Sequence, residues 1–401
     1  MWLAQVVSQL GDWFSSIALY TLILTLTGSA EKVGLFVGAQ FLPAALAGYW
    51  TGPLTDRFGR RKLMLIADFG RAALALCYLA VDRPERVPWI YGITVLMVLF
   101  QAVFEPARKS ALPDIVSREQ MVLANAISGA TWSSMLALGA AVGGIVAGFF
   151  GAQVAFLLNA LSFLLSAYFV SGLHFSSDHR EKREKAPWSE CWHYLWANPR
   201  IAAYACSKTL WCFGGGTALV LTLYGREVFP LSVKGGEVGA ISIGLFYAFR
   251  GLGAGFGPFI AYRIKGQSMH ALSSAITPGF FVGAVGYLLL SFTGNLPLAL
   301  FCVLLGHLGG ATQWVFSTSL LQLSLDEKVR GRVFALEYTG LNLAVAGSSY
   351  LVGWASDQGW ATPRLAQGLA LVMALSGAVM GLLLLATRSD KGPEERGFEG
   401  E

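Results

Sequence analysis

Residues 52–62 read Gly52-Pro53-Leu54-Thr55-Asp56-Arg57-Phe58-Gly59-Arg60-Arg61-Lys62, and this stretch decides the fold. Apolar runs flank it on both sides, at residues 33–54 and 63–81. Each run has about the 20 residues that a helix needs to cross a bilayer. The two glycines suit a helix end and a tight turn, and Asp56 is placed to accept hydrogen bonds from a helix N-terminus. The stretch is therefore expected to be a basic loop that joins two membrane-spanning helices.

Ten further apolar runs of similar length occupy the rest of the chain, and the loops between the runs are short except for residues 173–199. The expected spans are 3–27, 33–54, 63–81, 88–107, 121–148, 151–172, 200–224, 239–262, 271–292, 297–321, 333–355 and 363–386. The sequence therefore predicts an all-α membrane protein with twelve transmembrane helices.

The composition supports a membrane protein. Hydrophobic residues make up 55% of the 401 residues and charged residues 13%, whereas soluble domains carry roughly 25% charged residues. So few charges exclude a soluble domain of this size, and the high hydrophobicity excludes a disordered chain. The first span begins at residue 3 without a basic leader or a signal-peptide cleavage site, which favours a translation start upstream of Met1.

The basic residues are distributed unevenly between the two sides of the membrane. Of the 29 lysines and arginines, 20 lie in loops that follow even-numbered spans or in the C-terminal tail, and six lie in the opposite loops. Cytoplasmic loops carry such an excess, so both termini and the middle loop are expected in the cytoplasm. The net charge of +5 then reflects membrane topology and does not indicate a nucleic-acid partner.

No motif for a cofactor or a metal is present. The five cysteines show no ligand spacing, and no G-x4-G-K-[ST] loop for ATP occurs. An enzyme is not predicted either, because no cluster of His or acidic residues gathers at one membrane face. We expect neither cofactor nor metal.

The middle connection, residues 173–199, contains three tryptophans four residues apart, Trp188, Trp192 and Trp196. Pro187 is suited to open a helix there, and a tryptophan face beside a charged approach is typical of a helix lying on the membrane interface. The alternative is a plain tethering loop.

The two halves of the chain show a weak internal repeat. A shift of 205 residues places Gly52-Pro53 on Gly257-Pro258. Parallel repeats of this kind are one transporter architecture. The predicted organisation is a bundle of six helices at 1–172, a cytoplasmic linker at 173–199, a second bundle at 200–386 and a tail at 387–401.

The loop at residues 52–62 resembles the signature of the major facilitator superfamily, G-x3-D-[RK]-x-G-x-[RK]-[RK], at every fixed position. The resemblance implies two pseudo-symmetric six-helix bundles, a monomer that moves a small molecule by alternating access, and a bacterial inner membrane. It also implies that the loop gates the cytoplasmic side. The gate residues would be Gly52, Asp56, Arg57, Gly59, Arg61 and Lys62.

A narrower resemblance points to the drug:proton antiporter-3 branch, which includes macrolide-efflux-like proteins and the enterobactin exporter. It rests on Ser8-x-x-Gly11-Asp12, Asp68-x-x-Arg71-Ala72, Phe104-Glu105-Pro106-Ala107 and the loop Leu112-Pro113…Ala124-Asn125-Ala126. The chain departs from the antiporter pattern in span five, where Ala140 stands at a position that often holds proline. The small-residue stripe from Gly139 to Gly148 is kept.

Ionisable residues inside spans are the functional candidates, because each is costly in the bilayer and faces the bundle interior. The candidates for proton coupling or substrate contact are Asp12, Glu105, Lys208 and Arg250. Asp12 is either a proton carrier or a hydrogen-bonded packing acid, and Glu105 is either a partner of the gate arginines or an interfacial acid.

The other ionisable residues in the spans are expected to make local contacts with substrate or with neighbouring side chains. Lys208 and Arg250 would favour an anionic substrate, although Lys208 can instead snorkel. Asp68 and Arg71, three residues apart on one helix face, are expected to form an ion pair. Glu337, at the start of span eleven, favours a cytoplasmic latch.

Polar and aromatic residues near mid-span are candidates to line a pocket: Gln40, Asn125, Trp132, Trp211, Gln313 and Trp314. We predict a secondary active transporter that exports a small amphipathic, drug-like compound, coupled to protons as an antiporter. The alternatives are export of a siderophore or lipid-like metabolite and, in another class, a membrane sensor or a polytopic membrane enzyme.

Overall fold

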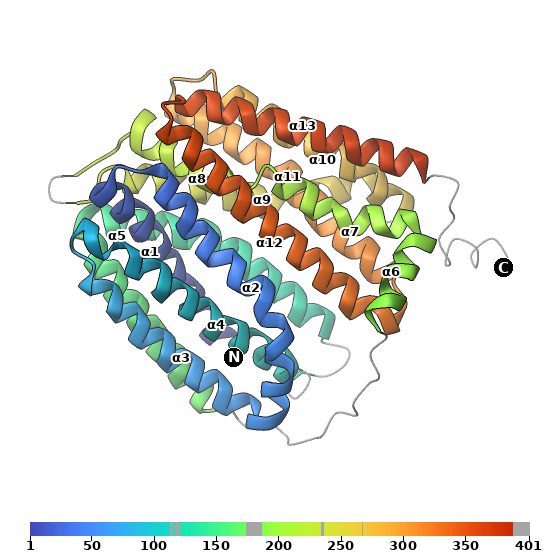
Figure 1. Ribbon diagram of the computed structural model, residues 1–401, viewed down its shortest axis with the longest axis horizontal. Coiled ribbons are helices and arrows are strands. Elements are labelled where there is room, and N and C mark those ends of the chain that lie inside the picture. The colour runs from blue at the N-terminus through green and yellow to red at the C-terminus, as the bar shows by residue number, and fades with distance from the viewer. Residues whose placement is uncertain (113–114, 117–120, 174–186, 234–235, 267, 388–401) are drawn as a thin grey trace. The chain divides into compact units, whose positions relative to one another are not determined.

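The computed structural model is helical, with no strand among the residues it describes (Figure 1). These residues are 1–112, 115–116, 121–173, 187–233, 236–266 and 268–387; within them, side chains are not described at 47–58, 109–110, 121–126 and 327.

The helices follow one another in the order of the predicted spans. They are α1 (Trp2–Thr27), α2 (Ala30–Phe58), α3 (Arg60–Cys77), α4 (Val87–Ala111), α5 (Met121–Ser171), α6 (Trp188–Ala197), α7 (Pro199–Cys212), α8 (Thr217–Leu223), α9 (Ala240–Lys265), α10 (Met269–Leu290), α11 (Leu296–Ser324), α12 (Glu327–Asp357) and α13 (Thr362–Ala386).

One of the predicted spans is broken, and two others meet at a sharp kink. The 51 residues of α5 comprise two helices, spans five and six, which meet at Gly151, whose φ of 82° is non-helical and one that only glycine adopts readily. Span seven is divided into α7 and α8 around residues 213–216. With this one difference the prediction of twelve spans is confirmed. Eight helices in the described part of the chain are long and apolar enough by composition alone to cross a membrane.

Gly59 forms the turn between the second and third spans. Helix α2 ends at Phe58 and α3 begins at Arg60, so one residue reverses the chain. Its φ of 73° lies in the left-handed region, where a side chain would be strained. The glycine in the basic loop is therefore required by the geometry of the turn.

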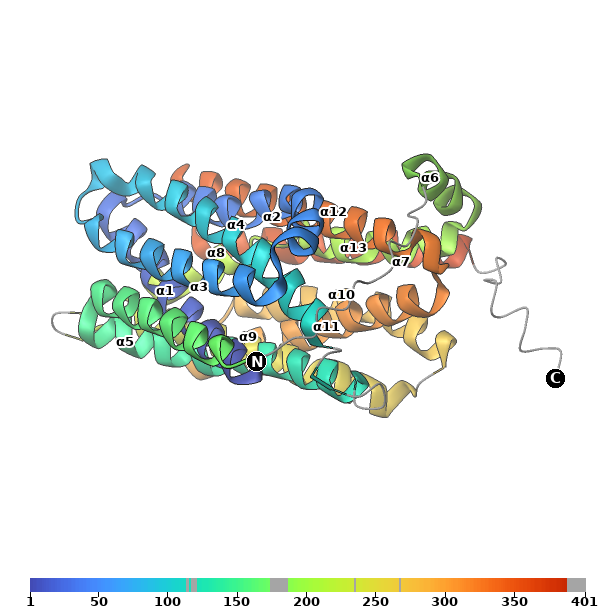
Figure 2. The ribbon, with the colours of Figure 1, turned by 90° about the horizontal axis from the view of Figure 1, so that it is seen from below.

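The chain forms two compact units, each assembled from separate segments, and each is described by itself. The first comprises 1–179, 217–252 and 349–365, and the second comprises 180–216, 253–348 and 366–401. In the first unit α5 packs against α1 and α3, and α4 packs against α2 and α3. In the second, α11 packs against α10 and α7 (Figure 2). The division into bundles at 1–172 and 200–386 stays a prediction.

The predicted helix of the middle connection is present as α6. It begins directly after Pro187, and its three tryptophans have different surroundings. The guanidinium of Arg332 lies 5.0 Å from the Trp188 ring, whereas Trp192 and Trp196 are 51% and 84% exposed. Two exposed tryptophans one turn apart suit the interfacial position that the sequence predicts.

Candidate functional site

A polar face on the first helix defines the candidate site. Asp12, Ser15, Ser16 and Leu19 follow the spacing of residues that share one helix face. On α4, Thr94, Val98 and Gln101 repeat the same spacing. Because a helix buries such a face only when the opposing surface satisfies it, the two faces predict a polar chamber inside the first unit.

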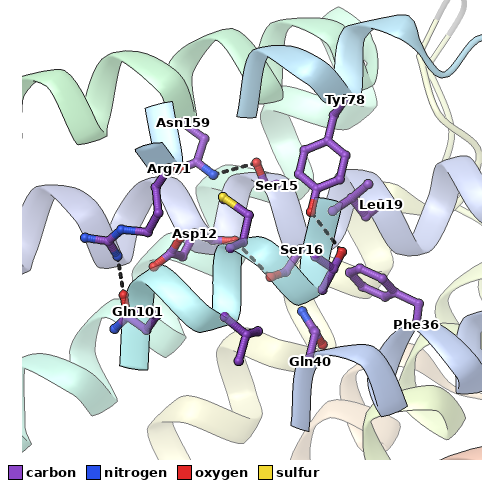
Figure 3. A pocket seen from close by; sticks show the side chains of 13 residues that line it. Asp12, Ser15, Ser16, Leu19, Phe36, Gln40, Arg71, Tyr78, Gln101 and Asn159 are labelled. Atoms are coloured by element: carbon purple, nitrogen blue, oxygen red, sulfur yellow. Dashed lines mark hydrogen bonds between the residues drawn. The ribbon is translucent and has the colours of Figure 1, made fainter. Parts of the chain in front are cut away.

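The structure contains this chamber as a cavity of about 170 Å³. Helices α1 to α5 and the short 3-10 turn after α3 contribute its walls (Figure 3). The lining residues are Asp12, Ser15, Ser16, Leu19, Phe36, Gln40, Arg71, Tyr78, Thr94, Met97, Val98, Gln101 and Asn159.

Asp12 is the acid of this cavity. It lies ten residues beyond Trp2, about 15 Å along α1, and is therefore close to the middle of the span. Its side chain forms no ion pair or hydrogen bond with the described residues; the hydroxyl of Ser16 donates 2.8 Å to its backbone oxygen instead. A carboxylate in this position is free to exchange a proton or to meet a cation.

Arg71 also lines the cavity, but its charge is balanced by other groups. One amino group lies 2.5 Å from the Asp68 carboxylate, and the two side chains are 2% and 0% exposed. A second amino group donates to Gln101, and the rings of Phe104 and Phe163 cover the guanidinium at 4.6 and 4.4 Å. Arg71 is thus held in place and positions the wall beside Asp12.

The carboxylate of Asp68 is held from two sides. Ser166 on α5 donates a 2.8 Å hydrogen bond to its second oxygen. The expected pair with Arg71 therefore connects α3 to α5 and α4, and it explains how a buried charge is tolerated: both partners have hydrogen bonds in addition to each other.

Neutral hydrogen bonds fix the remaining walls of the cavity. The amide of Asn159 donates 2.8 Å to the Ser15 hydroxyl, and the Tyr78 and Thr94 hydroxyls lie 2.8 Å apart. Both pairs are drawn in Figure 3. These bonds join α5 to α1 and the turn after α3 to α4, so they connect four of the six elements that build the chamber.

The size of the cavity limits what it can hold. Sites for drug-sized ligands have volumes of about 300–1,000 Å³, whereas a water molecule takes about 30 Å³. A chamber of about 170 Å³ fits a small group of waters around Asp12. It suits the path of a proton better than the seat of an amphipathic substrate.

Glu105 lies near the end of α4, and its side chain pairs with an arginine of the same helix. Its carboxylate is 2.9 Å from Arg108, whose other amino group donates 3.0 Å to Gln5 on α1. The expected partners were the gate arginines. Of these, Arg61 donates to the backbone oxygen of Ser171 at the end of α5, and Arg57 lies outside the described side chains.

Lys208 is engaged in the second unit. Its ammonium lies 3.0 Å from the Glu337 carboxylate, with side chains 6% and 4% exposed, and 5.1 Å from the Trp314 ring. Snorkelling of Lys208 is therefore wrong. Helix α12 begins at Glu327 and places Glu337 about 15 Å along the helix, and the expected cytoplasmic latch at Glu337 stays a prediction.

Arg250 differs from the other intramembrane cations. It lies ten residues beyond Ala240 on α9 and is half-buried. Its guanidinium lies 5.5 Å from the ring of Tyr247. Among the described residues no carboxylate forms an ion pair with it, in contrast to Arg71, Arg108 and Lys208.

The predicted pocket residues are distributed over several environments. Gln40 lines the Asp12 cavity. Trp211 is buried against Phe280, with ring centres 5.6 Å apart, and Gln313 accepts a 2.8 Å hydrogen bond from Ser207. Trp132 is 49% exposed. Gln40 and Trp132 belong to the first unit, whereas Trp211, Gln313 and Trp314 belong to the second, so a pocket shared by all of them stays a prediction.

Several predicted residues lie outside the described side chains. Gly52, Asp56 and Arg57 of the gate loop and Asn125 belong to this group. Lys62 is exposed at the start of α3. Of the loop residues, Gly59 and Arg61 are the ones whose turn and contact the structure gives.

Sequence reasoning missed Ser15, Ser16, Thr94 and Gln101. Each is an ordinary polar residue in a long apolar run, and single residues of this kind carry little signal. The available clue was their helical spacing. Ser15 and Ser16 share a helix face with Asp12 on one span, and Thr94 and Gln101 share a face of another span.

A helical membrane protein with polar and charged groups enclosed at mid-span is a membrane transporter by architecture. The sequence profile of the Major Facilitator Superfamily matches residues 1–323. The chain belongs to this family. It is accordingly a multi-pass membrane transporter and not an enzyme.

Curated relatives of low sequence identity to this chain are also transporters by name. The chain is 26% identical to the enterobactin exporter EntS of Citrobacter koseri, over 91% of this chain and 82% of EntS. It is 32% identical to the multidrug efflux pump Tap of Mycobacterium tuberculosis over 42% of each chain. It is 28% identical to the uncharacterized MFS-type transporter YfiS of Bacillus subtilis, over 41% of this chain and 39% of YfiS. The matches to Tap and YfiS thus span less than half of those proteins.

Solved structures share the fold. A POT family transporter in complex with a thioalcohol-conjugated peptide has a TM-score of 0.71 at 12% identity, covering 97% of this chain and 96% of that one. The nucleoside transporter NupG has a TM-score of 0.71 at 11% identity, covering 96% and 98%.

Proposed function

We propose that this protein exports a small amphipathic compound by alternating access and that inward proton flow drives the export. Asp12 is the proton carrier in this proposal. The observation that carries it is a mid-span carboxylate that lines a water-sized cavity while the neighbouring Arg71 is bonded to Asp68 and Gln101.

The chemistry follows from this arrangement. A carboxylate without a counter-ion is costly in the membrane interior and is favoured in its protonated form. When the cavity opens to water, the charged form gains hydration and the proton leaves. A group that changes protonation between two exposures supplies the coupling that an antiporter needs.

Export is supported by the relatives whose names state it. EntS is named an exporter of enterobactin and aligns with most of this chain, and Tap is named a multidrug efflux pump. Export of a siderophore is therefore the second candidate function, favoured by the longer alignment. The two candidates share the direction of transport and differ in the substrate.

The proposed topology places both termini, the linker 173–199 and the tail 387–401 in the cytoplasm of a bacterial inner membrane, with one bundle at 1–172 and another at 200–386. The protein is proposed to act as a monomer. In this arrangement the turn at Gly59 lies on the cytoplasmic side and Arg61 holds α3 to the end of α5 there.

Proton flux in proteoliposomes tests the proposal. A pH-sensitive dye is enclosed, a pH gradient is imposed, and candidate drugs and siderophores are added to the wild type and to Asp12→Asn. We expect substrate-triggered proton flux in the wild type and its loss in Asp12→Asn, which keeps the size of the side chain but carries no exchangeable charge.

The matched control is Asp82→Asn. Asp82 is an exposed acid outside the spans that pairs with Arg83 and Arg86 at 3.1 and 3.0 Å, so its replacement should leave the flux intact. Flux retained in Asp12→Asn would contradict the role of Asp12 and move it to Glu105 or Asp68. Binding of a compound without any proton flux would contradict proton coupling.

A further inference from the structure

Helices α1 and α9 bring three aromatic rings and one guanidinium together in the first unit. The ring of Tyr247 lies 5.7 Å from Trp13 and 5.9 Å from Tyr20, measured between ring centres. The guanidinium of Arg250 lies 5.5 Å from the same Tyr247 ring. We call these four residues the Arg250 cluster.

The cluster adjoins the Asp12 cavity but is distinct from it. Tyr20 contacts the cavity residue Phe36, with ring centres 5.5 Å apart, and its hydroxyl lies 3.5 Å from the Gln40 side-chain oxygen. Tyr20 therefore stands between the cavity and the cluster. A ligand at Arg250 would be close to the proton-carrying acid without occupying its chamber.

The four residues divide into a buried base and an accessible edge. Tyr20 and Tyr247 are buried, and the Tyr247 hydroxyl is fixed by donating 3.0 Å to the backbone oxygen of Ala218. Trp13 and Arg250 are half-buried, and each contacts the Tyr247 ring. The tyrosines thus hold a partly exposed tryptophan and a partly exposed guanidinium close to each other.

The charge of Arg250 is not neutralised by the described residues. A contact with a tyrosine face is weakly favourable and leaves the positive charge in place. An arginine near the middle of a span is costly unless an anion or water faces it. Its planar fork of donors matches a carboxylate in particular.

We infer that the Arg250 cluster is the substrate subsite for an aromatic compound that carries an acid group. Arg250 receives the acid group, and Trp13 stacks on the aromatic ring. The inference rests on the proposed function, since it names the class of compound that the exporter would carry. It also assigns the anion contact to Arg250 and removes it from Lys208, which Glu337 already neutralises.

Equilibrium binding to the purified full-length protein tests the inference with four probes of related shape. They are 2-naphthoate, 2-naphthylmethanol, 2-naphthylmethylammonium and cyclohexanecarboxylate, measured by calorimetry. We expect 2-naphthoate to bind most tightly, because it alone offers both the ring and the anion. Tighter binding of the ammonium probe or of the neutral probe to the wild type would overturn the inference before any variant is made.

Variants then locate the two contacts. Arg250→Gln should weaken 2-naphthoate by about ten- to a hundredfold, as for the loss of a charge-assisted hydrogen bond, and leave 2-naphthylmethanol unchanged. Arg250→Lys should retain part of the preference. Trp13→Leu should weaken 2-naphthoate but not cyclohexanecarboxylate.

The matched control is Arg263→Gln. Arg263 is on the same helix and lies 5.4 Å from the Phe259 ring, yet it is exposed near the helix end, so binding should not change. Asp12→Asn should keep the preference for 2-naphthoate. If Arg250→Gln binds 2-naphthoate as the wild type does, the inference fails while proton coupling by Asp12 stands.

Discussion

At the scale of single residues, this protein treats its intramembrane charges in two ways. Arg71 and Lys208 each have a carboxylate partner and are buried, whereas Asp12 and Arg250 form no ion pair with the described residues. We assign the paired charges to packing, because each already has an opposite charge in contact. The proposals assign protons and substrate to the two unpaired charges.

The Lys208–Glu337 pair yields a prediction about stability. Removing one partner leaves a buried charge without compensation, which costs about 3–5 kcal/mol, whereas replacing both by apolar residues is often neutral. We expect Lys208→Met and Glu337→Leu each to lower the melting temperature of the detergent-purified protein. The double variant should return close to the wild-type value.

The pair would not be purely structural if the double variant lowered the melting temperature by as much as the two single variants together. Trp314 provides a check on the local environment, because its ring lies 5.1 Å from the Lys208 ammonium. Trp314→Leu should lower the melting temperature less than either charge removal, since a contact of this kind contributes about 0.5–2 kcal/mol.

The residue scale also shows what the sequence could and could not predict. Asp68 and Arg71 share one helix, so their pairing follows from their spacing alone. Lys208 and Glu337 are far apart in the chain, and their contact depends on which faces of α7 and α12 meet. No pattern within either helix carries that information, and the sequence analysis therefore did not pair Glu337 with Lys208.

At the scale of helices, the apolar runs predicted the spans well because a membrane helix must satisfy its own backbone. Two joints between helices have local causes. Gly151 forms the kink between the two spans of α5, and the break between α7 and α8 falls in a run of glycines at 214–216. Length and hydropathy do not reveal such joints.

Small residues in α5 set the distance to its neighbours. A side chain on Gly144 would meet the backbone of Ala240 and Gly244 on α9 at 2.6 and 2.8 Å, and one on Gly143 would meet the backbone of α1 at 3.1 Å. The small-residue stripe seen in the sequence therefore serves close packing. Which helices it would contact was not visible from the sequence.

Helix α6 supports a prediction about its docking within the second unit. Its Cys191 is fully buried, and the hydroxyl of its Tyr194 donates 3.2 Å to the backbone oxygen of Ser324. Burial raises the pKa of the Cys191 thiol, and the positive charge of Arg332 opposes this in part. Because the thiolate is the reactive form, labelling of Cys191 by N-ethylmaleimide should be slow at neutral pH and faster as the pH rises.

The comparison is made in a variant that keeps Cys191 and replaces the other four cysteines. Trp188→Ala removes the contact with Arg332 and should speed labelling roughly tenfold or more, since local opening then costs less. Trp196→Ala is the matched control, because this tryptophan is on the same helix and exposed. Equal acceleration by both variants would sink the idea that Trp188 docks the helix.

At the scale of the whole molecule, the first unit contains segments from both halves of the chain. Its 217–252 and 349–365 segments belong to the second half of the sequence. Polar contacts join them to the first half. The carboxylate of Asp357, at the end of α12, accepts hydrogen bonds of 2.5 Å from Ser29 and 2.8 Å from the backbone of Ala30, and Arg226 donates 3.0 Å to Thr25.

Asp357 thereby caps the N-terminus of α2 from a different helix. A carboxylate at a helix N-terminus is favourable because it meets unpaired backbone donors and the positive end of the helix dipole. The charge pattern of the loops places this cap on the side opposite the basic loops. In the proposed alternating access between the bundles 1–172 and 200–386, each side opens in turn, and the cap is then expected to break once in every cycle.

A covalent cross-link tests this expectation. We expect Ser29→Cys/Asp357→Cys, joined by a short bifunctional maleimide on a cysteine-free background, to lose transport by at least about tenfold, because the state open on this side can no longer form. Each single variant, treated with the same reagent, should keep transport. The cross-linked protein should still bind ligand from the opposite side, which separates a blocked cycle from a misfolded protein. Undiminished transport after complete cross-linking would mean that the substrate crosses without separation of these two helix ends, and the alternating-access proposal would fail at this side.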